Sequence, residues 1–196
     1  MLQLRITLAT LFVAALVGCE GGPVAPLSPV VPRAAGVSGR FSDVGGPVSA
    51  TGGGHYDLGG LTVQFAFSAV QPSNGSVAGE FHHYADEGGG LVIDFYGSVT
   101  CLTEDPVNHH AWIGGIVTQN NSTDPDFQGD INQPGRDIWF RVLDAGEGSG
   151  VIDRTTFTGF QGSGGFQTSA DYCAGQPWPA NNARTWPVTG NVNVRP

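Results

Sequence analysis

The chain of 196 residues contains no lysine, and all eight of its basic residues are arginine. Without a lysine amine the protein can have no Walker A phosphate site, no Schiff base and no lysine general base. Only 13% of the residues are charged, and acids outnumber bases by 17 to 8, which gives a net charge of −9. Because an acidic surface repels phosphates, we expect neither nucleic acid nor an anionic lipid surface as a partner.

The sequence also lacks the short motifs of common enzymes. No serine stands in Gly-x-Ser-x-Gly, and neither Gly-x-Gly-x-x-Gly nor His-Glu-x-x-His occurs. These absences favour a non-catalytic domain that has a binding or structural role, although a catalytic carboxylate pair leaves no sequence motif. A hydrolase with a carboxylate or calcium site therefore stays open as an alternative. A second alternative is a barrel that carries a small apolar ligand.

The N-terminus has the pattern of an export signal. Arg5 precedes an apolar run from Ile6 to Val17, which is too short to span a bilayer comfortably. The residues Leu16-Val17-Gly18-Cys19 resemble the lipobox of bacterial lipoproteins. The resemblance implies removal of residues 1–18, a diacylglycerol and palmitate-type anchor on Cys19, and attachment to a membrane of the cell envelope. Glu20 is not the aspartate of an inner-membrane retention signal, so in a cell with two membranes we expect the outer one.

Residues 19–37 are expected to be a lipidated cysteine followed by a tether. Prolines recur every third residue at Pro23, Pro26, Pro29 and Pro32. This spacing matches the three-residue turn of polyproline II, which makes a stiff spacer between membrane and domain.

From residue 38 to residue 196 the pattern predicts a single all-β domain. Apolar residues alternate with polar ones from Leu61 to Ala69, from Leu91 to Cys101 and from Ile138 to Val142. Further strands are expected over 48–57, 76–84, 109–118, 154–161 and around 188–194. Glycine-bearing turns such as Leu58-Gly59-Gly60 connect them as hairpins. We therefore predict an antiparallel meander of about eight strands in a closed or nearly closed up-and-down barrel, with a two-sheet sandwich as the alternative.

Three cysteines divide into one for lipid and two for the domain. In an oxidising compartment Cys101 and Cys173 are expected to form a disulfide, with two free thiols or a metal pair as the alternatives. The period-two pattern places Cys101 on the inward row of its strand. The disulfide would fasten the long segment 162–186, one of two stretches (with 119–136) that break the strand rhythm.

Two acidic stretches are candidates for calcium. A glycine-rich turn carries Asp144, Glu147 and Asp153, and carboxylate oxygens are the ligands that calcium prefers. The loop 124–130 begins like an EF-hand but lacks its final glutamate, so we prefer the turn. The carboxylates of the turn could instead cap backbone N–H groups. We expect no cofactor, with calcium as the open alternative.

Two tryptophans in the segment 162–186 are candidate ligand-binding residues. Trp178 and Trp186 each stand beside proline, and exposed indole rings stack on sugars or insert into a partner. An envelope glycan or a protein is therefore a candidate partner. The alternative is that these rings pack down as a lid over the core.

Parts of the domain resemble glycine-rich exported β domains of high-GC bacteria, a group for which no activity is known. The resemblance is carried by Ala50-Thr51-Gly52-Gly53-Gly54, Val99-Thr100-Cys101-Leu102, Asp144-Ala145-Gly146-Glu147-Gly148 and Gly190-Asn191-Val192-Asn193-Val194. It implies an exported β domain and adds nothing about function.

Overall fold

The computed structural model describes residues 47–148 and 150–196. The predicted signal and tether, residues 1–37, lie outside the described residues. The strands are β1 (Val48–Leu58), β2 (Leu61–Gln71), β3 (Ala78–Gly88), β4 (Leu91–Asp105), β5 (His110–Asn120), β6 (Asp137–Leu143), β7 (Arg154–Thr155), β8 (Gly159–Phe160), β9 (Trp186–Pro187) and β10 (Thr189–Arg195). The helices are the 3-10 turns η1 (Pro125–Phe127), η2 (Asp130–Asn132) and η3 (Ser163–Gly165), and the α-helix α1 (Ser169–Gly175).

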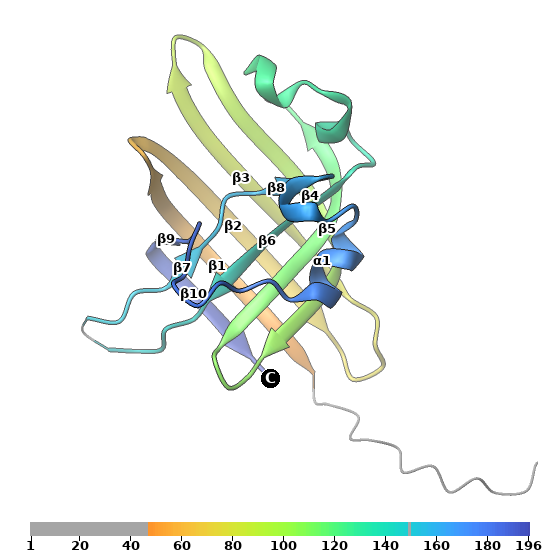
Figure 1. Ribbon diagram of the computed structural model, residues 1–196, viewed down its shortest axis with the longest axis vertical. Coiled ribbons are helices and arrows are strands. Elements are labelled where there is room, and N and C mark those ends of the chain that lie inside the picture. Colours follow the sequence, from red (N-terminus) through yellow and green to blue (C-terminus); the bar gives the residue numbers. More distant parts are fainter. Residues whose placement is uncertain (1–46, 149) are drawn as a thin grey trace, which may run out of the picture. The chain divides into compact units, whose positions relative to one another are not determined.

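The strands form an antiparallel meander that curls into a nearly closed barrel (Figure 1). Strands β1 to β6 each pair with the next strand along the chain, and β10 returns to pair with β1. This arrangement confirms the predicted all-β fold and the up-and-down barrel in preference to the sandwich. Within the described residues, no helix is long and apolar enough to cross a membrane.

Period-two patterning determines which face of each strand is buried. In β2, Val63, Phe65 and Phe67 are buried while the residues between them are exposed. The turn into β2 uses Gly59 and Gly60 at positive φ, the left-handed conformation that a tight hairpin requires. Alternation and turn together fix the register, because a slip of one residue would turn the apolar row to water.

Aromatic rings fill the interior of the barrel. The ring of Phe140 packs edge-on against Phe67 and Phe81, with centroids 5.2 Å and 5.6 Å apart. Phe81 lies directly on Gly97, where an added Cβ would stand 2.0 Å from the ring. His83 is also inside, with no exposed surface, and its centroid lies 5.0 Å from that of Phe140. The interior is thus occupied by side chains.

Among the described residues the barrel wall has one seam, because the path of paired strands ends at β10 on one side and at the short strands β7 and β9, beside the end of β6, on the other. Two carboxylates bridge it. Asp153 accepts the backbone N–H of Val192 in β10 at 2.7 Å, and Asp144 accepts that of Val194 at 3.0 Å. The other oxygen of each carboxylate accepts a backbone N–H from the turn after β6, at 2.9 Å and 2.8 Å. At the seam, carboxylate side chains therefore accept the backbone N–H groups of β10. Elsewhere in the barrel, the carbonyl groups of a neighbouring strand accept such bonds.

A second layer covers the outside of β4, β5 and β6, where α1 lies against the wall (Figure 1). The Sγ atoms of Cys101 and Cys173 are 2.00 Å apart, which confirms the predicted pairing. The inward position predicted for Cys101 was wrong. A β-bulge at Thr100 places two residues of β4 opposite one of β5, so Leu102 enters the core and Cys101 faces α1.

The strand predicted over 154–161 is interrupted. The short strands β7 and β8 both pair with β6, but residues 156–158 between them leave the ladder. One backbone bond from Thr156 to the Arg141 carbonyl, at 3.0 Å, persists there. A cavity opens beside this interruption, and residues 156–159 line it.

Candidate ligand-binding site

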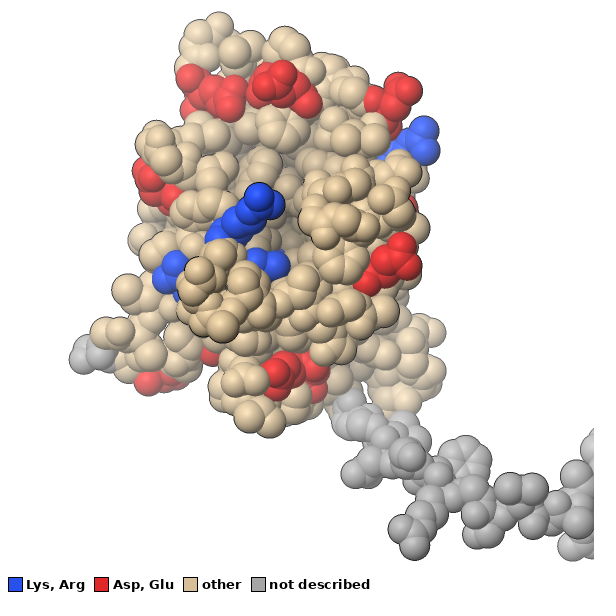
Figure 2. Space-filling model, in the orientation of Figure 1, with Lys and Arg blue, Asp and Glu red and all other residues tan. Residues whose placement is uncertain are grey.

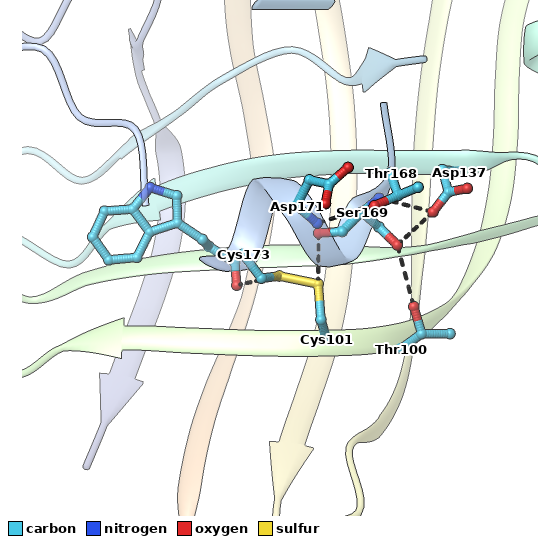
Figure 3. The surroundings of a disulfide bond; sticks show 8 residues. Thr100, Cys101, Asp137, Thr168, Ser169, Asp171 and Cys173 are labelled. Carbon is cyan, nitrogen blue, oxygen red and sulfur yellow. Dashed lines mark hydrogen bonds between the residues drawn. A yellow bond between two sulfur atoms is a disulfide. The ribbon is translucent and has the colours of Figure 1, made fainter. Parts of the chain in front are cut away.

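Helix α1 is held on the barrel wall by three local features. Figure 3 shows two of them, the disulfide and the contacts of Asp137. The disulfide joins it to β4, and Asp137 of β6 accepts the backbone N–H of Ser169 at 2.8 Å and its hydroxyl at 2.7 Å. Gly114 of β5 allows the close approach, because a Cβ there would lie 2.6 Å from the sulfur of Cys101. A helix of seven residues is not stable alone, so these contacts position it.

The chain that follows α1 is held by two outward side chains of the wall. The Pro177 carbonyl accepts bonds from Trp112 Nε1 and from Arg141 Nη1, both at 3.0 Å. The Ala183 carbonyl accepts a bond from Arg141 Nη2 at 2.9 Å. Arg141 therefore fastens the segment at both ends of a bend and is itself covered, with 8% of its surface exposed.

Between this covering segment and the outer side of β6 lies a cavity of about 700 Å³. Its floor includes Trp139 and Arg141, and the interrupted strand forms one wall. Aromatic and aliphatic side chains dominate the surface. The lining residues are Leu58, Trp139, Arg141, Thr156, Phe157, Thr158, Gly159, Ser163, Gly164, Phe166, Tyr172, Pro177, Pro179, Ala183, Arg184 and Trp186.

Small side chains in the lining make room for large ones. Gly159 faces the indole of Trp139, and a Cβ there would lie 2.4 Å from Nε1. Trp139 in turn stacks on Tyr172 of α1, with centroids 5.6 Å apart. The cavity is thus a built space between two packed layers.

The electrostatics of the cavity are unusual for this chain. Two of the lining residues, Arg141 and Arg184, are cations, and no described lining residue is Asp, Glu, His or Cys. Figure 2 shows arginine atoms beside a hollow near the centre of this face, while the acidic atoms lie toward the outline of the face. Burial raises the pKa of the Tyr172 phenol, and the neighbouring Arg141 guanidinium opposes that shift.

Two buried polar atoms at the cavity have no hydrogen-bond partner. These are Arg141 Nε and Thr158 Oγ1, and both side chains are 8% exposed. Buried polar groups in proteins are normally satisfied, so each such atom calls for an explanation.

The two candidate tryptophans have different surroundings. Trp186 lines the cavity and stacks on Tyr56 at 6.0 Å. Trp178 belongs to the covering segment itself. Its ring stacks on His110 of β5 with centroids 3.6 Å apart, and the Arg141 guanidinium lies 5.2 Å from its centroid. Its Nε1 donates to Asn182 at 2.8 Å. Trp186 is therefore placed to meet a ligand, and Trp178 supports Arg141.

The candidate calcium residues do not converge in the structure. Asp144 and Asp153 direct their oxygens to the backbone N–H groups of the seam, while Glu147 is exposed. In the other acidic loop, Asp124 caps η1 by accepting the N–H of Asp126. Across residues 47–148 and 150–196, no group of three or more His, Cys, Asp or Glu side chains is arranged to hold a metal ion.

Sequence reasoning did not find Arg141, Trp139 or Thr158. One feature of the sequence could have revealed this site. Trp139 is a large apolar residue, yet the alternation of β6 places it on the row of residues that should face outward. Both faces of β6 are in fact buried. A tryptophan on an outward row indicates that a second layer covers that face, and the arginine two residues later is then covered too.

Comparison of the chain with protein-family models, with curated proteins and with solved structures found no match. The geometry of the site is therefore the basis for any functional conclusion.

Proposed function

We propose that this protein is an exported, membrane-anchored lipoprotein whose β domain binds a small molecule, without catalysis, in the cavity outside β6. The observation that carries the proposal is the cavity itself. Its volume of about 700 Å³ lies within the usual range of ligand sites, and a mostly apolar lining with a few polar groups is typical of them.

The contents of the cavity favour binding over hydrolysis. Hydrolases use a carboxylate, an imidazole, a thiol or a metal to move protons or to attack the substrate. The described lining residues supply none of these side chains. Ser163 is present, but its hydroxyl accepts the backbone N–H of Phe160 at 3.0 Å and has no adjacent base among the lining residues.

The packed interior of the barrel leaves no room for the small apolar ligand that a carrier would hold there. Rings of Phe65, Phe67, Phe81 and Phe140 occupy the centre of the barrel. A ligand carried by this domain would therefore lie outside the wall, beneath the segment that α1 and the disulfide hold in place.

Binding is tested by filling the cavity. A panel of small aromatic compounds is screened by saturation-transfer NMR against the wild type and against Ala183→Trp. The added indole occupies the cavity, whereas the Ala183 carbonyl that Arg141 needs belongs to the backbone and remains. The matched control is Val107→Trp, which adds the same ring at a site that is 82% exposed.

We expect compounds that bind the wild type and Val107→Trp and lose their signal with Ala183→Trp. A panel in which every binder tolerates Ala183→Trp would show that the cavity is not the site.

The anchor is tested separately. The lipobox resemblance at Leu16-Val17-Gly18-Cys19 supports lipidation of Cys19. Cys19→Ala is expected to release the protein from the membrane fraction or to leave it unprocessed. An unmodified mature N-terminus at another residue, detected by mass spectrometry of the wild type, would contradict the proposal.

A further inference from the structure

We propose that the ligand of this cavity is an anion, with a carboxylate or similar group beside Arg141 and a flat apolar body against the aromatic walls. This inference rests on the proposed binding function and specifies its ligand class.

The first observation is a buried cation without an acidic partner. Among the described residues the one contact between a basic and an acidic side chain within salt-bridge distance joins His82 and Asp94, and Arg141 takes no part in it. Arg141 is instead satisfied by two backbone carbonyls, which carry only partial charge, and its Nε has no partner. A buried charge is costly unless it is paired. An anion in the adjoining cavity would supply the missing charge.

The second observation is the distribution of charge. The chain has 17 acidic residues and only eight arginines, yet the described lining holds two arginines and no acid. Arg184 is exposed at the cavity and would attract an anion during approach. A cavity intended for a neutral or cationic molecule gives no reason for this exclusion of acids from its surface.

The third observation is the second unpartnered atom. Thr158 Oγ1 is buried in the wall of the same cavity and can donate a hydrogen bond. The guanidinium of Arg141 has five N–H groups, two of which donate to the carbonyls of the cover, while Nε has no partner. Its planar fork matches the geometry of a carboxylate. Both residues are about nine-tenths buried, so the proposal requires the cover to shift before Arg141 Nε and Thr158 Oγ1 can reach the ligand.

The aromatic walls define the rest of the ligand. Trp139, Tyr172 and Trp186 present ring surface to the cavity, and Pro177 and Pro179 add rigid apolar surface. Such walls select a planar apolar body rather than a sugar-like one with many hydroxyls, because the described lining offers few hydrogen-bonding groups away from the arginines.

The test compares two probes of nearly the same shape, of which one is an anion and the other is neutral: 1-naphthylacetate and its amide, 1-naphthylacetamide. Affinities are measured by isothermal titration at pH 7 with the wild-type domain. We expect the acetate to bind about 10-fold more tightly than the amide, as charge-assisted hydrogen bonds to a guanidinium allow.

Variants assign the preference to the arginines. Arg141→Lys keeps the positive charge but loses the planar guanidinium fork, so we expect it to reduce the preference for the acetate over the amide. Arg141→Met removes the charge as well and is expected to abolish this preference. Replacement of Arg141 can also disturb the covering segment that this residue holds. Arg184→Gln is therefore a second, independent variant, because Arg184 is exposed. It should weaken acetate binding about threefold and leave the amide unchanged. Arg136→Gln, an exposed arginine of the 119–136 loop, should change neither.

The outcomes separate the two proposals. Equal binding of acetate and amide, both lost in Ala183→Trp, would overturn the anion inference and leave the binding function standing. A preference for acetate that survives both Arg141→Met and Arg184→Gln would also overturn it. Failure of both probes to bind at millimolar concentration would count against the cavity as a binding site altogether.

Discussion

The buried imidazole of His83 should make this domain sensitive to acid. His83 has no exposed surface, and neither ring nitrogen has a hydrogen-bond partner. Its neighbours are the rings of Phe65, Phe81 and Phe140. Burial, and secondarily the nearby His82, lower the pKa of His83 to about 3 from the ordinary value of 6.5. The perturbation that tests this is His83→Phe.

The size and the sign of the effect follow from that shift. Above pH 6.5 the imidazole is neutral in both the folded and the unfolded chain, so it contributes no pH dependence. Between pH 6.5 and about 3 the unfolded chain takes up a proton that the folded chain refuses, and stability falls by about 1.4 kcal/mol per pH unit. At pH 4.5 the loss from this one group is about 3 kcal/mol, a large part of a typical stability of about 5–15 kcal/mol.

The assay is urea denaturation of the wild type and His83→Phe at pH 7 and at pH 4.5. Carboxylates titrate in both proteins, so the difference between the two pH dependences isolates His83. We expect the variant to lose about 3 kcal/mol less than the wild type between the two pH values. His83→Leu, which avoids overfilling the core, should give the same difference. Parallel loss of stability in all three proteins would refute the reasoning.

Three further predictions concern the seam, the covering helix and the disulfide. Asp153→Asn removes the charge that accepts N–H groups on both sides of the seam, and should lower the free energy of unfolding by roughly 2 kcal/mol in urea titrations. Millimolar calcium should not change the melting temperature of either form; a rise in the wild type alone would instead favour a calcium site. Gly114→Ala should destabilise the domain by about 1–3 kcal/mol, because its Cβ meets the disulfide sulfur, whereas Gly53→Ala, with its nearest contact at 3.5 Å, should cost much less. Replacing Cys101 and Cys173 by serine should lower the melting temperature and cost up to about 4 kcal/mol; unchanged melting would contradict a stabilising role.

The strands of the barrel were predictable because their information is local. In β2 every second residue is apolar, and the hairpin before it carries two glycines at positive φ. Period and turn chemistry together specify a half-buried strand and its register without knowledge of the partner strand.

The departures from regularity were not predictable, because they depend on contacts between distant segments. Val99, Thr100 and Cys101 are all compatible with a regular strand, so nothing local marks the bulge that turns Cys101 outward. Likewise the sequence 154–161 has strand-like composition. It breaks after β7 where Arg141 N donates to the Thr156 hydroxyl, at 3.1 Å, in place of a ladder partner.

The candidate site was found only in part for the same reason. Trp186 was a candidate because of its type and its loop, and it lines the cavity. Arg141 was missed because an arginine between two inward apolar residues normally points into water. Its burial results from the segment around Pro177 and Ala183, which reaches it across 36 and 42 residues of chain.

The disulfide also determines what a protease can do to this molecule. Residues 128–131 are exposed, and a cut there would divide the chain between Cys101 and Cys173. The two pieces would stay covalently joined, one carrying β1 to β5 with the cavity residue Leu58, and the other carrying the cavity residues from Trp139 to Trp186. A nicked molecule would migrate as one species without reductant and as two with it, and it would keep its site. If the protein is anchored and binds a ligand as proposed above, a cut in this loop would not release the half that carries the cavity.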